Sequence, residues 1–462
     1  MRSIWAVAEN TIKQAVRMRV ATIFIVLLLI LLPVLGLSST GDGTLKGRLQ
    51  SFISYGMSLT SMLLCLLTII VSIHALTSDI SQRQIYMVLT KPIRRYELLL
   101  GKLLGVLILD AVLLLLLSST IYWIATYMPK YYGSSDVELA EAKNEFLTAR
   151  KSIVPADVDV SKEVMERYAE LRRTGQLDQL FEGITQDAII AQLTNQIKLN
   201  KRAAEVGKEL IWEFENVRIR DPNGSLFVRF KYDVSVTPPD EQVYGQWFIG
   251  DYRYIKNGVS VQSQNPPQLY PPFGRKDPVR TFREIEMPAD AVAPDGYVAV
   301  AFLNTQLNNT TIFFPLGDGL EVLYKADSFT ANFARGVLLV FFRLVFLTCL
   351  GVFAATFLSF PVAILLCIVV FFTASFSGFV IDSFSYLSTN ISLVYSFTIK
   401  WIVHLLPQLD KINPNQYLVP GRLISWGVVG RALLFLVMIK AVLLFILGLV
   451  IFKFREIAKI IV

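Results

Sequence analysis

The stretch "SDISQRQIYMVLTKPIRRYELLLGK", Ser78 to Lys102, lies between two long apolar runs of the chain. It is short, basic and broken by one proline, Pro92. Apolar runs near or above about eighteen residues predict transmembrane helices, because a helix rising about 1.5 Å per residue needs about twenty residues to cross the hydrocarbon core. The stretch is therefore predicted to be a loop between two membrane spans, and its side of the membrane fixes the topology of the rest.

The composition agrees with a membrane protein. Of the 462 residues 53% are hydrophobic, and the mean hydropathy is +0.51. We predict an α-helical integral membrane protein with six transmembrane helices, at 20–37, 56–76, 103–123, 336–358, 361–381 and 432–452. The three cysteines all fall inside apolar runs, which leaves no disulfide framework for the polar part of the chain.

The distribution of Lys and Arg around the spans predicts the orientation. Basic residues precede the first span, follow the last one, and crowd the opening stretch. With six crossings these clusters fall on one side, and an excess of Lys and Arg marks the cytoplasmic side. Both termini and the loop 77–102 are thus predicted to be cytoplasmic, in a multi-pass protein of a bacterial plasma (inner) membrane. The net charge of +7 is explained by these juxtamembrane clusters, so no nucleic-acid partner is expected.

One apolar segment, 391–414, carries Lys400 and His404 and does not fit the count. As a seventh span it would move the basic C-terminal tail to the outside. We prefer a re-entrant or interfacial helix on the outer side, because such a backbone is tolerated where protein or a cavity covers it. The alternative of a full span for 391–407 stays open.

The polar region between the third and fourth spans predicts an extracytoplasmic α+β domain. Residues 135–210 are expected to be helical, and 211–325 to be β-rich. Alternation along "VRFKYDVSV" places Val228, Phe230, Tyr232, Val234 and Val236 on one face of a strand, and Asn257-Gly258 suits a hairpin turn. The expected architecture is a helical stalk that carries a β-sandwich. The predicted domains are 1–127 (an amphipathic helix and spans 1–3), 128–334 (extracytoplasmic) and 335–462 (spans 4–6).

Few residues of the chain suggest catalysis. There is no G-x-x-x-x-G-K-[ST] phosphate loop, and the only histidines, His74 and His404, lie far apart in the sequence. Carboxylates in the polar region could form a glycosidase pair, but solvated surface charge is the simpler interpretation. The aromatic residues of the polar region could bind carbohydrate, although their alternating positions favour a place in the core of the β-sandwich. These residues are Glu213, Glu215, Asp233 and Asp240, and Trp212, Trp247, Phe248 and Tyr252.

Three charged residues lie inside predicted spans, namely Asp110, Arg343 and Lys440. Charge at membrane depth costs roughly 2.5–3.5 kcal/mol on insertion scales, so such residues usually face protein or a water-filled cavity. They predict either a polar lining of a translocation path or, as we slightly prefer, structural ion pairs between spans.

The opening stretch resembles the cytoplasmic loop of permeases of the type-2 ABC exporter class, which carry a pattern close to R-E-I-E-x-R-T-I-Y-x-x-L-x-K-P-x-x-R-x-x-x-L-G-K. Ser78, Ser81 and Gln84 depart from this pattern. The residues that match it are Asp79, Arg83, Ile85, Tyr86, Leu89, Lys91, Pro92, Arg95, Leu100, Gly101 and Lys102. Residues 4–20 resemble the amphipathic N-terminal helix of such permeases, and 405–426 their segment before the last span.

This resemblance implies a membrane-spanning permease subunit of an ATP-driven exporter, not itself an enzyme. It would pair with a second permease copy or a paralogue, and a separate ATP-binding subunit would bind the ATP, so no cofactor is expected in this chain. The loop would couple to that ATPase through a surface helix ended by Pro92, with Asp79, Gln82 and Arg83 facing water. The residues expected to contact the ATPase are Asp79, Gln82, Arg83, Tyr86, Lys91, Pro92, Arg94 and Arg95.

Other interpretations remain at this stage. Lys91, Arg94 and Arg95 could hold anionic membrane-lipid head groups instead, and the loop could serve only to fix topology. The chain could also be a membrane-anchored extracytoplasmic binding or scaffold protein, or a membrane-bound glycan-active enzyme. The transported substrate and the choice between homodimer and heterodimer are left open by the sequence.

Overall fold

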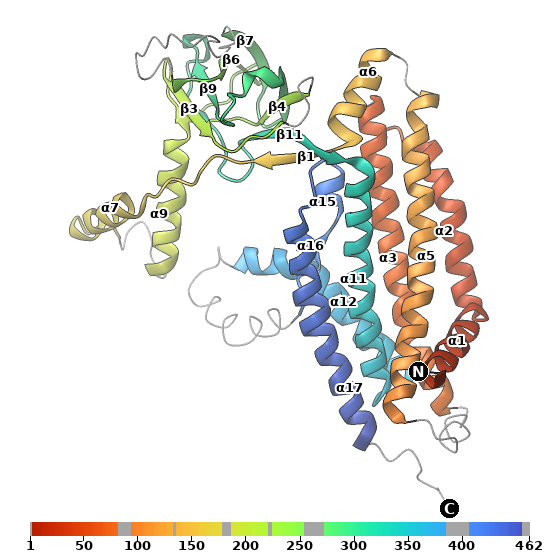
Figure 1. The fold of residues 1–462 in the computed structure, drawn as a ribbon. Helices are drawn as coiled ribbons and strands as arrows, with labels where there is room; N and C mark the ends of the chain where they lie inside the picture. The colour runs from red at the N-terminus through yellow and green to blue at the C-terminus, as the bar shows by residue number, and fades with distance from the viewer. Residues whose placement is uncertain are drawn as a thin grey trace, which may run out of the picture. The chain divides into compact units, whose positions relative to one another are not determined.

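The computed structural model describes residues 2–81, 94–132, 135–177, 186–219, 224–253, 272–384 and 406–454. These residues form two compact units (Figure 1). Within the described residues, the helical unit contains the chain up to Ala149 and from Ser328 onward, and the polar unit is Arg150–Asp327. The predicted hairpin turn at Asn257-Gly258 and most of the segment 391–414 lie outside the described residues.

The helical unit contains five described helices that are long and apolar enough to cross a membrane. Four are continuous helices, and the last is built from α16, the π-helical η5 and α17. The four continuous ones are α3 (Leu45–Ser81), α5 (Arg95–Tyr132), α11 (Phe329–Ala355) and α12 (Phe360–Phe384). The last one joins α16 (Trp426–Ala432), η5 (Leu433–Ala441) and α17 (Val442–Phe454). The prediction of several membrane-spanning helices is confirmed.

The count of six spans depends on one further helix, α2 (Arg19–Ser38). Its described apolar part, Thr22–Ser38, is shorter than the other candidates. α2 packs on α5 where Gly36 leaves room for Ile124, since a Cβ at Gly36 would lie 3.0 Å from the Ile124 Cγ2. The six-span count and the re-entrant helix stay predictions.

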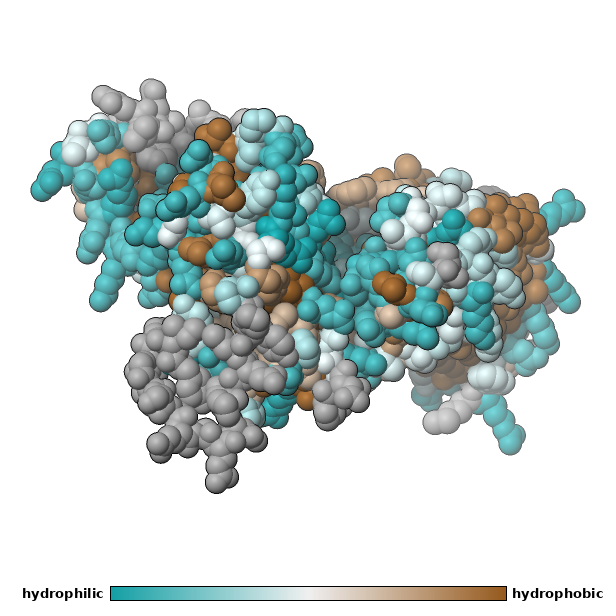
Figure 2. All heavy atoms as spheres, turned by 90° about the horizontal axis from the view of Figure 1, so that it is seen from above, coloured by the Kyte–Doolittle hydropathy of each residue, from teal (hydrophilic) through white to brown (hydrophobic). Residues whose placement is uncertain are grey.

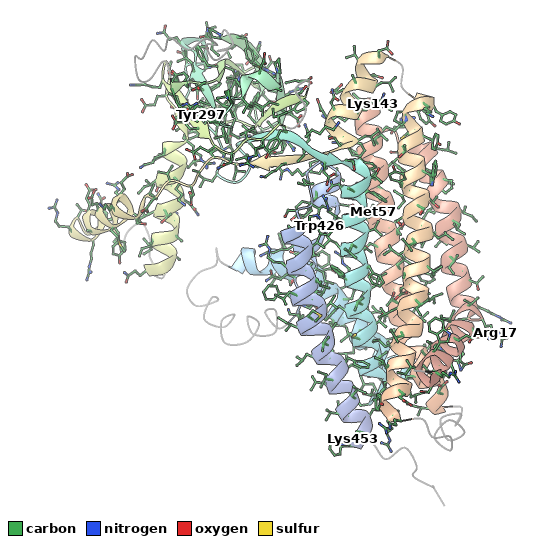
Figure 3. The ribbon with its side chains drawn as sticks, viewed as in Figure 1. Arg17, Met57, Lys143, Tyr297, Trp426 and Lys453 are labelled. Atoms are coloured by element: carbon green, nitrogen blue, oxygen red, sulfur yellow. The ribbon has the colours of Figure 1, made fainter. Side chains whose placement is uncertain are left out.

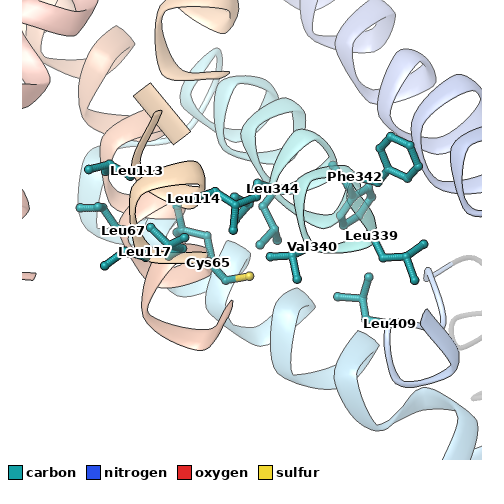
Figure 4. Close-up of a cluster of buried hydrophobic side chains, with 14 of the residues drawn as sticks. Cys65, Leu67, Leu113, Leu114, Leu117, Leu339, Val340, Phe342, Leu344 and Leu409 are labelled. Atoms are coloured by element: carbon teal, nitrogen blue, oxygen red, sulfur yellow. The ribbon is translucent and has the colours of Figure 1, made fainter. Parts of the chain in front are cut away.

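The core of the helical unit lies where α3, α5 and α11 pack together. Figure 4 shows Cys65 of α3, Leu114 and Leu117 of α5 and Leu344 of α11 in one buried cluster. Leu409, which follows the undescribed segment, joins the same cluster. The helices differ in burial, because 72% of the most apolar part of α11 is buried but only 17% of that of the last span.

The polar unit contains two four-stranded sheets, with strand orders β1-β11-β4-β8 and β3-β9-β6-β7. The pairs β11-β4 and β4-β8 of the first sheet and all pairs of the second are antiparallel. Inward side chains of both sheets form one core around Trp247, Phe230 and Phe302, so the predicted sandwich is present. A small sheet of β2 (Ala203–Ala204), β10 (Ile312–Phe313) and β5 (Asp233–Val234) lies beside them. The long strands are β1 (Thr148–Ile153), β3 (Glu209–Phe214), β4 (Ser225–Phe230), β6 (Gln242–Gly250), β7 (Phe273–Pro278), β8 (Arg283–Pro288), β9 (Val298–Asn304) and β11 (Leu320–Ser328).

Two local predictions for the polar region are wrong. The segment 136–153 was expected to be one helix, but only α6 (Asp136–Glu141) and η1 (Ala142–Phe146) are helical, and β1 follows as the neighbour of β11. Sheet pairing there outweighs the helical propensity of the sequence. The strand predicted through 228–236 breaks after Phe230, and Val236 is 68% exposed.

Two helices of the polar region lie where they were expected, α7 (Ser161–Arg173) and α9 (Gln186–Lys201). They pack through a small cluster that includes Val164, Leu171 and Leu193. In the view from above in Figure 2, hydrophilic residues cover most of the polar unit, with small hydrophobic areas between them.

Candidate functional site

The first helix, α1 (Arg2–Val16), packs against α5 through small residues. A Cβ added at Gly101 would lie 2.6 Å from the Val7 Cβ, and one at Gly105 would lie 2.7 Å from the Thr11 Cβ. The two glycines are four residues apart, so they share one face of α5. A pair of small residues at this spacing lets two helix backbones approach closely. The amphipathic α1 is therefore fixed to the N-terminal part of α5.

A buried polar cluster joins the same helix pair to α3. The Lys102 Nζ lies 2.7 Å from the Asp79 Oδ2, and the two side chains are 1% and 7% exposed. The Lys102 Nζ also donates to the Gln14 Oε1 at 3.1 Å, and the Gln14 Nε2 donates to the Asp79 Oδ1 at 3.4 Å. Each of the three side chains thus contacts both others. We call Gln14, Asp79 and Lys102, with Gly101 and Gly105, the α1 junction.

The start of α5 is held by a second set of contacts. The Arg95 Nη1 donates to the backbone oxygens of Phe452 and Lys453, at 2.9 and 2.7 Å. These carbonyls belong to the last turn of α17, where a cation is favoured by the helix dipole. Glu97 accepts the backbone N–H of Arg94 at 3.2 Å. The two helices that flank the segment 82–93 are therefore both held in place. The Asp79–Lys102 ion pair joins the end of α3 to α5, and Arg95 joins the start of α5 to α17.

The structure corrects the prediction for Asp79. This residue was expected to face water on a surface helix, but it lies inside the end of α3 and is 5% exposed. Its carboxylate is occupied by Lys102 and Gln14, and thus contributes to packing within the chain. Arg94 is exposed, and Arg95 contacts α17. Gln82, Arg83, Tyr86, Lys91 and Pro92 lie outside the described residues.

Asp110 occupies a different environment, about halfway along α5, where it is fully buried. The hydroxyls of Thr68 and Thr348 approach its carboxylate, the latter at 3.4 Å. The Thr348 hydroxyl is closer to the backbone oxygen of Leu344, at 2.8 Å, so little of its donor strength reaches Asp110. The Asp110 Oδ1 has no hydrogen-bond partner. No described cation pairs with this carboxylate.

Asp110 and Arg343 do not form an ion pair with each other, although ion pairs between spans were the preferred interpretation of the three charges. The Arg343 guanidinium donates instead to the Ser61 Oγ at 3.2 Å and to the backbone oxygen of Leu409 at 3.0 Å. Lys440 does not reach either residue, because its Nζ donates to the backbone oxygen of Leu406 at 2.7 Å. The three charged residues therefore lie at separate sites. Two of them, Arg343 and Lys440, donate hydrogen bonds to backbone oxygens of the segment that begins at Leu406.

That segment packs closely on α11 and α12. The Leu409 N–H donates to the Ala374 oxygen at 3.1 Å, and a Cβ at Gly378 would lie 1.9 Å from the Asp410 Oδ2. The glycine is thus required for the carboxylate to lie against α12. A short 3₁₀ turn follows at Asp410–Ile412. The Leu409 oxygen accepts both the Ile412 N–H, at 3.3 Å, and the Arg343 guanidinium, at 3.0 Å, so Arg343 ties this irregular segment to α11.

The carboxylates of the polar unit are largely engaged in structural contacts. Asp233 pairs with Arg280 at 3.1 Å and Asp240 with Lys276 at 3.0 Å. Glu213 accepts the Tyr297 hydroxyl at 3.2 Å. Burial, with the negative charge of Glu213 beside it, raises the pKa of Tyr297 to about 12. These contacts favour surface charge over a glycosidase pair.

The aromatic residues divide in a similar way. Trp212 and Trp247 are 8% and 0% exposed and belong to the sandwich core, as preferred from their spacing. Phe248 is half-buried, and the Tyr252 hydroxyl donates to the Glu209 Oε1 at 2.9 Å. No described cluster of His, Cys, Asp or Glu has the geometry of a metal site.

Sequence reasoning missed most of the α1 junction. Gly101 and Lys102 were noted only as part of a loop pattern, and Gln14 and Gly105 were not noted at all. The sequence did contain a signal, because "GKLLG" from Gly101 to Gly105 is a small-xxx-small pattern within a membrane helix. The partner of Lys102 could not be read from sequence, since Gln14 and Asp79 lie 88 and 23 positions away.

Comparison with known families bears on this same part of the chain. Residues 5–140 match the family model described as ABC-2 family transporter protein. The matched range contains α2, α3, α5 and nearly all of α1, and so includes the whole α1 junction. No curated protein and no solved structure matches the chain significantly.

Proposed function

We propose that this membrane protein, whose residues 5–140 form an ABC-2 transporter domain, is the permease subunit of an ATP-driven exporter. The observation that carries the proposal is the family match, which extends over the α1 junction and the basic loop beside it. A separate ATP-binding subunit supplies the energy, and a second permease copy or a close relative completes the transport path.

The coupling element of this proposal is the segment 82–93 with its flanking residues. A force applied to a loop is transmitted only if the helices at its two ends are held firmly. Here α3 is held by Asp79 and Lys102, and α5 by Arg95 and by the glycine contacts with α1. This arrangement supports a docking role for the loop, with Gln82, Arg83, Tyr86, Lys91 and Pro92 as the residues that face the ATPase.

The docking role is tested by removing loop side chains without disturbing the α1 junction. A Gln82→Ala/Arg83→Ala variant should insert normally, lose copurification with the ATP-binding subunit and lose transport-coupled ATP hydrolysis. Asp79 is left unchanged, because its removal would break the buried ion pair. Lys143→Gln, an exposed charge of the helical unit far along the chain, is the matched control. Normal ATPase binding and transport by the double variant would reduce the loop to a topology determinant.

The proposed topology places both termini in the cytoplasm of a bacterial inner membrane, and the polar unit outside. Arg17 and Lys453 lie at the same end of the helical unit and Lys143 at the other, which supports this topology (Figure 3). An impermeant thiol reagent added from outside should label a cysteine placed at Asn309 but not one at Lys459. Cys65, Cys349 and Cys367 are buried, so the background should be low. Labelling at Lys459 would overturn the topology.

A further inference from the structure

The last span and the segment before it enclose a groove of about 430 Å³ on the helical unit. Its lining combines three cations with apolar side chains such as Leu406, Ile412 and Phe435. The cations are Lys411, Arg431 and Lys440, from three separate elements. No Asp or Glu of the described residues lines the groove. The groove is therefore positively charged along one part of its wall and apolar along the rest.

The three cations are not neutralised within the described part of the chain. The Lys440 Nζ donates to the Leu406 oxygen, and the Arg431 Nε donates to the Gly427 oxygen at 3.3 Å. Both acceptors are neutral carbonyls. Asp410 precedes Lys411 in the chain, but its carboxylate lies against Gly378 of α12 and does not line the groove. The groove thus has positive charge and donor capacity without an anion of its own.

Cations without an anionic partner are unusual on a span of this kind. Of the five candidate spans, the last one is the most apolar and also the least buried. Phe435, Met438 and Ile439 beside the groove are about half exposed, at 55%, 58% and 49%. A cation on such a helix is costly unless an anion or an interfacial position compensates it. Lys440 also lies within the π-helix η5, a rare conformation that occurs frequently at functional sites.

We propose that this groove binds an anionic phospholipid, with the phosphate head group held by Lys411, Arg431 and Lys440. The acyl chains would lie along the exposed apolar side chains of η5, where a water-soluble anion would gain nothing. A phospholipid would thus contact both the cations, through its phosphate, and the apolar side chains of η5, through its acyl chains. This site is separate from the loop at 82–93 and does not depend on ATP hydrolysis.

The test uses the full chain, purified in a neutral detergent, and native mass spectrometry with added lipid. The wild-type chain should retain phosphatidylglycerol in preference to phosphatidylcholine. Arg431→Gln and Lys411→Gln each remove one exposed cation, and each should weaken retention of phosphatidylglycerol about fivefold. Because both side chains are exposed, these variants should fold, which a thermal unfolding curve can verify. Lys143→Gln removes an exposed charge elsewhere and should leave retention unchanged.

Three results would overturn the proposal. One is equal retention of the two lipids by the wild-type chain, because the cations would then not select an anionic head group. Another is unchanged retention in both Arg431→Gln and Lys411→Gln. The third is displacement of phosphatidylglycerol by millimolar inorganic phosphate, because the groove would then be a site for small anions and the apolar wall would be irrelevant.

Discussion

Two buried aspartates of the helical unit lie in opposite environments. Asp79, at the end of α3, has a lysine at 2.7 Å and a glutamine beside it. Asp110, halfway along α5, has threonine hydroxyls and one oxygen without a partner. Both are nearly or fully inaccessible to solvent. The difference shows that burial alone does not tell what a membrane carboxylate does for the fold.

The comparison leads to a rule about the cost of mutation. Removing one member of a buried ion pair leaves the other charge uncompensated, which is strongly destabilising. Removing a carboxylate that has no cation strands no charge. Asp79 is therefore expected to be essential for the fold, and Asp110 to be replaceable as far as stability is concerned.

The largest expected effect is that of Asp79→Ala. Because Lys102 would be left charged and buried, the variant should lose about 3–5 kcal/mol of stability. The loss is measured from thermal or denaturant unfolding of the purified chain in detergent. The double variant Asp79→Ala/Lys102→Met should recover part of it, since no charge is then stranded. A double variant as unstable as the sum of the two single changes would contradict the ion pair.

The next effect concerns the close approach of α1. Gly101→Val adds bulk where the Val7 Cβ and the Ile4 oxygen already lie within 2.6 and 2.9 Å of a Cβ position. Overpacking of this kind costs about 1–3 kcal/mol. The loss is measured from unfolding curves of the purified chain in detergent. Gly430→Ala is the matched control, because nothing lies within 4 Å of that Cβ position.

A smaller effect is expected in the polar unit, where a buried hydroxyl meets a carboxylate. Tyr297→Phe removes the hydrogen bond to Glu213 and should cost about 1 kcal/mol at neutral pH. The pKa of Tyr297 is raised to about 12, so folding holds the proton more tightly than the unfolded chain does. This stabilisation is complete below about pH 10 and is lost between pH 10 and 12. Unfolding curves of the variant should depend less steeply on pH in that window.

The smallest effect on stability is expected for Asp110→Asn, at about 0.5 kcal/mol or less, because only weak hydrogen bonds change. If Asp110 and Arg343 do not interact, the losses caused by Asp110→Ala and Arg343→Ala should be additive in the double variant. A large loss for Asp110→Asn would show that this carboxylate has a charged partner, and would remove the contrast with Asp79.

The sequence predicted much of this architecture, for identifiable reasons. Long apolar runs gave five of the helices, because a span needs an uninterrupted apolar stretch. The alternating residues Val228 and Phe230 do lie in a strand, β4, although the predicted continuation to Val236 is not formed. The segment at 148–153 was mistaken for a helix, because its pairing with β11 depends on residues far away in the sequence.

The candidate site was harder to predict for the same reason. Asp79 was assigned from local periodicity, which cannot show that Lys102 and Gln14 lie beside it. Asp110 and Arg343 were grouped because both are charged and lie inside spans, although depth along two helices does not fix the distance between two side chains. Contacts between residues distant in the sequence thus account for both errors.

The length of α5 has a mechanical consequence. Its 38 residues form one unbroken helix of roughly 57 Å, almost twice the roughly 30 Å of a hydrocarbon core. α1 packs against α5 near one end, at Gly101 and Gly105, and from Gly105 α5 extends for roughly 40 Å more. A rigid rotation of α5 by about 5° about its contacts with α1 would therefore displace the far end of α5 sideways by about 4 Å. Because α5 also packs against α3 and α11, such a rotation would require these helices to move with it, and a small movement beside the loop would then reach Tyr132 as a side-chain-sized displacement.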